Sequence, residues 1–347
     1  MRRLLKIMSA IFLLFLPACM ATPELHLNSS DMSMELKQSA PIVLSVALSP
    51  DMRFALSGNM KETATLWDLT SAAAVRTFSA PGGMMGQVKV AFSQDGLYGM
   101  TGGKGLKIWD LSTGREERTM GDWEIWHIAV SPDKRAILTG VNRTPRLIPN
   151  GTQGRIILWD MSTGSEIREF KDEFKCSAVA LSSDGRYALS GTQAGNIILW
   201  DVATGRRLHS VKADSGFSYL PGPGLVISVA FSPDGKYALS GGWDGTVKLW
   251  SIPSLSPVKK FKGHTGMAGV GAVAFSQDGK YALSGGPSDG FIKLWDISTG
   301  AEVKSIKAHS GMYGVHSLAI SPDGKFILSG GDASTRIWDM STLDEVA

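Results

Sequence analysis

Short apolar runs alternate with polar turn clusters along most of this chain, and they recur in the same order. Val229-Ala230-Phe231 and Tyr237-Ala238-Leu239, for example, flank a Ser-Pro-Asp-Gly turn that begins at Ser232. Apolar runs of this length, bounded by Gly, Pro, Ser and Asp, are typical of β-strands. Asp-Gly between two such runs is a strong hairpin signal, because Gly tolerates φ > 0. The pattern therefore predicts many short antiparallel strands.

Two markers divide the chain into seven similar units. A Trp, followed by Asp in six of the seven units, recurs 41 to 50 residues apart, and a Ser-Pro-Asp-Gly turn or a close variant precedes each Trp. A period of this length indicates a repeated supersecondary unit. The marker Trp residues of units 1 to 7 are Trp67, Trp109, Trp159, Trp200, Trp250, Trp295 and Trp338, and the turns begin at Ser49, Ser93, Ser131, Ser182, Ser232, Ser276 and Ser321.

With both markers repeated seven times, residues 34–347 resemble the WD40 repeat family. The resemblance implies an all-β, seven-bladed β-propeller in one domain, each blade being a four-stranded antiparallel sheet with strands a to d. The last unit ends at Ala347, where its outer strand should only be starting, so we expect the segment from Met34 to Gln38 to supply that strand and close the ring. Closure of this kind removes a free sheet edge.

Loop lengths vary on one face only. The distance from the turn Ser to the end of strand b, and that from the Trp to the end of strand d, are constant. The b–c connection ranges from the short Thr101–Trp109 spacing to the long Thr139–Trp159 spacing, and the d–a connection varies as well. Both lie at the same end of an antiparallel blade. Variable loops on a rigid scaffold are the usual layout of a binding surface, although neutral drift produces the same pattern.

Aromatic and Met residues in these variable connections are candidate contacts for a protein or peptide partner. Trp and Tyr are favoured at interfaces, and Met makes adaptable contacts. Trp123, Trp126 and Trp243 stand outside the marker positions. Three d–a loops share a Gly-Met-containing core, whose Met side chains either line the rim of the channel or fold inward as plugs. The candidates are Trp126, Trp243, Phe217, Tyr219, Met84, Met267, Met312 and Tyr313.

Two His-Ser-Asp sets could be mistaken for catalytic triads. Their repetition in adjacent units argues against catalysis, and in the WD40 family such residues form a structural network that satisfies buried polar groups. Carried over, the sets are His264-Ser284-Asp289-Trp295 and His309-Ser329-Asp332-Trp338, with a partial set of Ser240-Asp244-Trp250 that has Asp214 at the His position. The first four units lack an Asp at the matching position. We therefore expect those units to rely more on apolar packing.

No other enzyme, metal or cofactor motif is present. His127, His209 and His316 fall in different units without a shared spacing, so we predict no metal site and no cofactor. Inner strands such as Ser-Val-Ala-Leu and Ala-Val-Ala-Phe also offer almost no ligands toward a central channel.

Residues 1–18 read as an export signal, and residues 19–33 as a polar tether. Arg2, Arg3 and Lys6 precede an apolar run that is too short for an ordinary membrane helix. The run ends at Leu16-Pro17-Ala18-Cys19, which resembles the bacterial lipoprotein signal and implies acylation of Cys19. A plain secretory signal cut after Ala21 is the alternative. Acylation predicts a lipid-anchored protein of the cell envelope, at the outer membrane or in the periplasm of a Gram-negative cell.

The balance of basic and acidic residues argues against a nucleic-acid partner. The 35 basic residues include Arg2, Arg3 and Lys6, whose removal leaves 32, equal to the 32 acidic residues. Binding to phosphates needs a basic stripe, and none is present. Cys176 would be the only thiol left besides Cys19, and we expect it to be a buried core residue.

The sequence thus predicts a non-enzymatic, monomeric scaffold that binds a protein or peptide on its loop-rich face, the d–a and b–c end. A propeller enzyme or a small-ligand binder that uses the central channel is the alternative from another class. A purely structural repeat array is the third interpretation.

Overall fold

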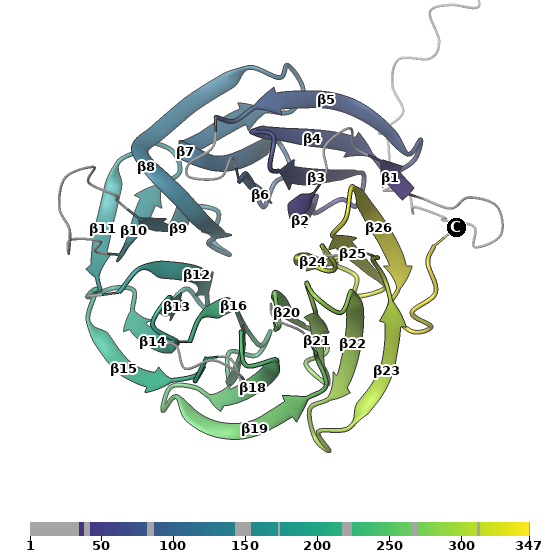
Figure 1. Cartoon of the computed structure of the whole chain (residues 1–347). Helices are drawn as coiled ribbons and strands as arrows, with labels where there is room; N and C mark the ends of the chain where they lie inside the picture. Colours follow the sequence, from purple (N-terminus) through teal and green to yellow (C-terminus); the bar gives the residue numbers. More distant parts are fainter. Residues whose placement is uncertain are drawn as a thin grey trace, which may run out of the picture.

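The fold is all-β. The computed structural model describes residues 35–37, 42–81, 87–142, 154–172, 174–216, 224–265, 269–310 and 313–346, and within these ranges it contains strands but no helix. None of these residues therefore forms a helix that is long and apolar enough to cross a membrane. Figure 1 shows the sheets arranged around a common centre, with one strand of each unit innermost. This architecture is consistent with a β-propeller.

The described strands form six antiparallel sheets, five of four strands and one of six. Units 1, 4, 5 and 6 each form one sheet whose strands follow one another from the centre outward. Their strands are β2 (Val43–Leu48), β3 (Phe54–Asn59), β4 (Thr63–Asp68) and β5 (Ala73–Ser79) in unit 1; β12 (Cys176–Leu181), β13 (Tyr187–Thr192), β14 (Asn196–Asp201) and β15 (Arg207–Lys212) in unit 4; β16 (Val226–Phe231), β17 (Tyr237–Gly242), β18 (Thr246–Ser251) and β19 (Ser256–Lys262) in unit 5; and β20 (Ala272–Phe275), β21 (Tyr281–Gly285), β22 (Phe291–Asp296) and β23 (Glu302–Lys307) in unit 6.

Units 2 and 3 share the six-stranded sheet, which departs from the expectation of four separate strands in every unit. Its strands are β6 (Lys89–Phe92), β7 (Tyr98–Asp110), β8 (Glu116–Val130), β9 (Ala136–Asn142), β10 (Gly154–Asp160) and β11 (Glu166–Lys171). β7 covers both strands b and c of unit 2, and β8 covers strand d of unit 2 and strand a of unit 3. These two junctions have the shortest b–c and d–a connections in the chain. A connection too short to form a separate loop continues as bent strand, with register shifts at Lys104/Leu106 and Ile125/His127.

The sheet of unit 7 includes a strand from the other end of the chain. β24 (Ser317–Ile320), β25 (Phe326–Gly330) and β26 (Ser334–Asp339) are followed on the outside by β1 (Glu35–Lys37), which pairs with β26 in an antiparallel register that places Leu36 opposite Thr335. Unit 1 also contacts unit 7, because the Val46 amide donates a hydrogen bond of 3.0 Å to Ser317 Oγ.

Apolar clusters lie between neighbouring units and hold them together. Phe78 and Leu66 of unit 1 pack with Phe92 and Trp109 of unit 2. Equivalent clusters join every later pair of neighbours, and one joins Val43 of unit 1 to residues of unit 7. Each marker Trp is buried in one of these clusters. Because burial of apolar surface is the main stabilising term in folding, the Trp residues belong to the scaffold rather than to an exposed surface.

The turns between strands a and b repeat one hydrogen-bond pattern. In unit 5, Ser232 Oγ donates to Asp234 Oδ1 over 2.7 Å and accepts from the Tyr237 amide over 2.9 Å. The fourth residue of the turn has positive φ, at 70° for Gly235. Met52 and Lys134 occupy this position in units 1 and 3, at φ of 59° and 64°. This left-handed backbone conformation is unfavourable for any residue that carries a Cβ atom.

Replacement of Lys134 by Gly should therefore stabilise the protein. The left-handed conformation costs a non-Gly residue about 1–2 kcal/mol, and the flexibility of Gly in the unfolded chain offsets part of that gain, so we expect a rise of about 1 kcal/mol in the free energy of unfolding. Urea denaturation of Lys134→Gly measures it. Lys134→Ala, which keeps the Cβ, is the control, and an equal effect of both variants would contradict this explanation.

Candidate binding site

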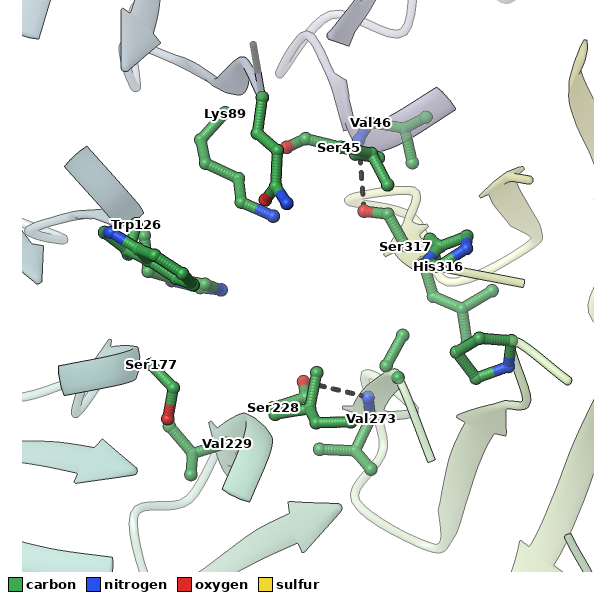
Figure 2. Close-up of a pocket in the computed structure, with 18 of the residues that line it drawn as sticks. Ser45, Val46, Lys89, Trp126, Ser177, Ser228, Val229, Val273, His316 and Ser317 are labelled. Atoms are coloured by element: carbon green, nitrogen blue, oxygen red, sulfur yellow. Dashed lines mark hydrogen bonds between the residues drawn. The ribbon is translucent and has the colours of Figure 1, made fainter. Parts of the chain in front are cut away.

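A cavity of about 480 Å³ lies at the centre of the molecule, and all seven inner strands line it. We call it the central cavity (Figure 2). Its wall includes Leu44 near the start of β2, Trp126 of β8 and His316 directly before β24, together with Trp243 and Pro287 from b–c connections. Since each inner strand begins at its d–a connection, the central cavity lies toward the end that carries the variable loops.

Serine hydroxyls on the wall link neighbouring units. Ser45 Oγ accepts a hydrogen bond of 3.0 Å from the Val90 amide, and Ser228 Oγ accepts one of 3.1 Å from the Val273 amide. Ser317 makes the same bond to unit 1, as described above. All three serines stand four residues before the turn Ser of their unit. Where this position is Ser, its hydroxyl therefore connects two neighbouring units.

Units 2 and 3 place titratable side chains at the same position, namely Lys89 and His127. His316 lies one position earlier in unit 7 and also lines the central cavity. The sequence pattern does not predict this cluster, because the three residues share no spacing along the chain. A signal was available nonetheless: two of them occupy the position that is Ser or Ala in the other five units.

Burial lowers the pKa values of Lys89, His127 and His316. Burial lowers the pKa of the Lys89 ammonium to about 8. Burial, reinforced by the positive charge of Lys89, lowers the pKa of both His127 and His316 to about 4. Both imidazoles are therefore neutral at pH 7. The central cavity then carries a single positive charge, that of Lys89.

Trp126 and Trp243 both line the central cavity, and both are half-buried. Trp243 was expected in a b–c connection, and it lies there, directly after β17, with its amide donating to the Leu225 carbonyl over 3.1 Å. Trp123 and Trp126 were expected on the face that carries the variable connections; both lie within the continuous strand β8. The Trp123 ring has the guanidinium of Arg155 4.8 Å from its centroid.

The remaining partner-contact candidates are placed only in part. Tyr313 is described and is 43% exposed, on the d–a connection that leads into β24. Cys19, Phe217, Tyr219, Met84, Met267 and Met312 lie outside the described residues.

The first His-Ser-Asp set forms a continuous hydrogen-bonded chain. Trp295 Nε1 donates to Ser284 Oγ over 2.8 Å, and Ser284 Oγ lies 2.7 Å from His264 Nε2. His264 Nδ1 lies 2.9 Å from Asp289 Oδ2. Full satisfaction of these groups requires Ser284 to donate to Nε2 and Nδ1–H to donate to the carboxylate. Ser284 is fully buried, so its hydroxyl is out of reach of a substrate.

The second set repeats this geometry in unit 7. Trp338 Nε1 and His309 Nε2 each lie 2.8 Å from Ser329 Oγ, and His309 Nδ1 lies 2.7 Å from Asp332 Oδ1. Ser329 is also fully buried.

In unit 5, the buried Asp214 stands where units 6 and 7 have His, and neighbouring backbone amides satisfy its carboxylate. Asp214 Oδ1 accepts from the Gly216 amide over 2.6 Å, and Oδ2 accepts from the Asp244 amide over 3.2 Å. Burial raises the pKa of Asp214, and the nearby Asp244 carboxylate raises it further. Lys248 offsets this, because its Nζ lies 2.5 Å from Asp244 Oδ2 and also donates to the Ala213 carbonyl.

The first four units retain one bond of the network. Their marker Trp donates to the Ser or Thr of strand b over 2.7 to 2.9 Å, at Ser57, Thr101, Thr139 and Ser190. In unit 5, Trp250 donates likewise to Ser240 over 2.9 Å. The hydroxyl at the end of strand b thus satisfies the buried indole N–H in every unit, with or without the His and Asp.

Other candidate chemistry is sparse in the described part of the chain. Cys176 is buried, and burial raises the pKa of its thiol, which keeps it protonated and unreactive. Among the described residues, no group of three or more His, Cys, Asp or Glu side chains is placed to hold a metal ion.

Comparison with known families identifies WD40 repeats in four places. The model of the family described as "WD domain, G-beta repeat" matches residues 164–201, 217–251, 255–296 and 300–339. The matches begin at the end of unit 3 and continue through unit 7. Comparison with curated proteins found no match. Together with the all-β fold, the four repeats indicate a protein of the kind that typically serves as a non-enzymatic interaction scaffold.

Proposed function

We propose that this protein is a non-enzymatic scaffold that binds a protein or peptide on the end carrying the d–a and b–c connections. The observation that carries the proposal is the central cavity, which lies toward that end and has Trp126 and Trp243 in its wall. Half-buried aromatic side chains around a cavity suit the anchoring of a partner side chain, since they bury a large area at a small entropic cost.

The scaffold that presents this surface is, in our proposal, a seven-bladed propeller closed by the N-terminal strand. The pairing of β1 with β26 and the hydrogen bond from Val46 to Ser317 support closure. The shared sheet of units 2 and 3 counts as two blades joined by long strands. We further propose that the scaffold acts as a monomer and has no nucleic-acid partner, since its basic and acidic residues balance once residues 1–18 are removed.

Capture of a partner from a lysate of the source cells tests the proposed surface. We expect Trp243→Ala to lose at least one partner that the parent protein retains, with an affinity loss on the order of 10-fold or more for an anchoring aromatic residue. Leu97→Ala is the control, because Leu97 is 62% exposed beside an a–b turn at the opposite end. If the Trp243→Ala variant keeps every partner, or if Leu97→Ala loses the same ones, the proposed surface is wrong.

We also propose that the protein is a lipoprotein of the bacterial cell envelope, anchored through Cys19. The motif Leu16-Pro17-Ala18-Cys19 supports this proposal. Two or more acyl chains hold a protein stably at a membrane, where a single chain does not. Mass spectrometry of the mature N-terminus should find an acylated Cys19. An unmodified N-terminus at Thr22 would instead indicate a plain secretory signal.

A further inference from the structure

Among the described residues that line the central cavity, Lys89 is the only one with a charge at pH 7. The residues that line the cavity include no Asp, no Glu and no other Lys or Arg. Within the described ranges, Lys89 takes part in none of the ion pairs or side-chain hydrogen bonds of the protein. Lys89 is half-buried, and an ammonium partly removed from water without a counterion is unfavourable, so proteins usually pair such a group.

The surrounding groups do not supply the missing negative charge. Ser45, Ser228 and Ser317 use their hydroxyl oxygens to accept backbone amides. His127 and His316, the other titratable groups on the wall, are neutral at pH 7 as described above. The pKa of Lys89 is lowered to about 8 because burial without a negatively charged partner disfavours its charged form. A bound anion would restore the balance.

The geometry favours a monoanion attached to a larger molecule. Figure 2 shows Lys89 and Trp126 extending into the central cavity from neighbouring parts of its wall, with His316 on the far side. A single ammonium matches the single charge of a carboxylate, whereas phosphate groups are usually held by several cationic or amide donors. The apolar part of the wall, with Leu44, Trp243 and Pro287, suits the residues that flank such a carboxylate.

We propose that the central cavity receives a Glu or Asp side chain of the bound peptide, whose carboxylate accepts a hydrogen bond from Lys89 Nζ. Residues next to that acidic side chain lie against Trp126 and Trp243. This inference deepens the proposed function and rests on it, because it names the chemistry of the partner that the same surface selects.

Selection from a random heptapeptide display library tests the inference. The library is selected in parallel on the purified parent protein and on Lys89→Met and Lys61→Met. Lys61 is exposed on a b–c connection outside the central cavity, so its substitution removes the same charge from the same end of the molecule. Peptides enriched on the parent are then synthesised with Glu or Asp changed to Gln or Asn. Free glutarate, a small dicarboxylate, is added as a competitor.

We expect peptides from the parent and from Lys61→Met to share an acidic residue at one position, and peptides from Lys89→Met to lack it. Change of that residue to its amide, or of Lys89 to Met, should weaken binding by about 10-fold or more, the usual loss for a hydrogen bond between charged groups. Lys89→Met removes an unpaired charge and should fold normally, and a thermal melt verifies this. If it does not fold, Lys89→Gln takes its place.

Three results would overturn the inference. Enriched peptides without an acidic position, or with one that persists on Lys89→Met, would leave the binding surface in place but remove the role of Lys89. Glutarate that competes as strongly as the acidic peptides bind would identify a small anion as the ligand. A library with no enrichment on the parent would count against the proposed function itself.

Discussion

Replacement of Leu36 by Ala should lower the free energy of unfolding by about 3 kcal/mol, the middle of the range for a buried Leu→Ala change. Leu36 is only 1% exposed, and it belongs to the apolar cluster that contains Val43 of unit 1 and Leu328 and Ile337 of unit 7. The loss should be large for a residue in a three-residue strand, because this side chain packs at the junction between units 1 and 7. Urea denaturation of the parent and the variant measures it.

Val303→Ala is a matched control for Leu36→Ala. Val303 lies in the outer strand β23 but is 47% exposed, so its truncation should cost no more than about 0.5 kcal/mol. If Leu36→Ala also costs that little, β1 is not held against β26 in solution, and closure by the N-terminal strand is wrong.

Replacement of Asp289 by Ala is the second large effect that we expect, at about 2–3 kcal/mol. The Asp289 carboxylate accepts from the amides of Thr265 and Phe291 over 2.9 and 3.1 Å and lies 2.9 Å from His264 Nδ1. The substitution leaves a buried imidazole without its acceptor, and an unsatisfied buried polar group costs about 1–3 kcal/mol. The melting temperature should fall while the affinity for a partner stays the same.

The pH dependence of this effect has a defined sign. Burial alone would raise the pKa of Asp289, but the hydrogen bonds that its carboxylate accepts, above all that from His264, lower it below its ordinary value of 3.8. The lowered pKa means that the stabilisation is complete above about pH 4 and is lost as the pH falls through the pKa of the folded state. The difference between the parent and Asp289→Ala should therefore shrink below pH 4.

Glu117→Ala controls for the loss of a negative charge, because Glu117 is exposed in β8 and makes no side-chain hydrogen bond or ion pair with the described residues. It should leave the melting temperature nearly unchanged. An Asp289→Ala variant that melts with the parent would show that the hydrogen-bonded set does not stabilise unit 6.

The repeated markers predict the strands well, because they encode local structure. Asp at the third position of each a–b turn and Gly or another left-handed residue at the fourth determine where a hairpin forms. The marker Trp and the strand-b hydroxyl lie on adjacent strands of one sheet, so their hydrogen bond follows from the local register. The His and Asp of units 6 and 7 also meet across a short distance within one repeat.

The sequence pattern predicts strand boundaries less well where the connection between two strands is unusually short. It predicts separate strands and loops in units 2 and 3, whereas the short connections there let β7 and β8 continue across two expected strands each. Trp126 consequently lies in a strand that lines the central cavity rather than in a loop.

The candidate site was the least predictable part, because it is assembled from strands of different units. Lys89, His127 and His316 are far apart in the sequence, and only the circular arrangement of the inner strands brings them to one cavity. A search by spacing does not find such a cluster. Alignment of the seven units with one another does expose Lys89 and His127 as unusual residues.

The most direct test of the central claim is photo-crosslinking of a display-selected peptide, followed by mass spectrometry of the attachment sites. A peptide with a benzophenone next to its acidic residue should attach to residues of the central cavity, above all Trp126, Trp243 and Pro287. The competing location is a groove of about 700 Å³ at the opposite end, between units 6 and 7, which Gln277, Tyr281 and Met340 help to line. Attachment at the central cavity is the result we predict, and attachment in that groove would contradict it.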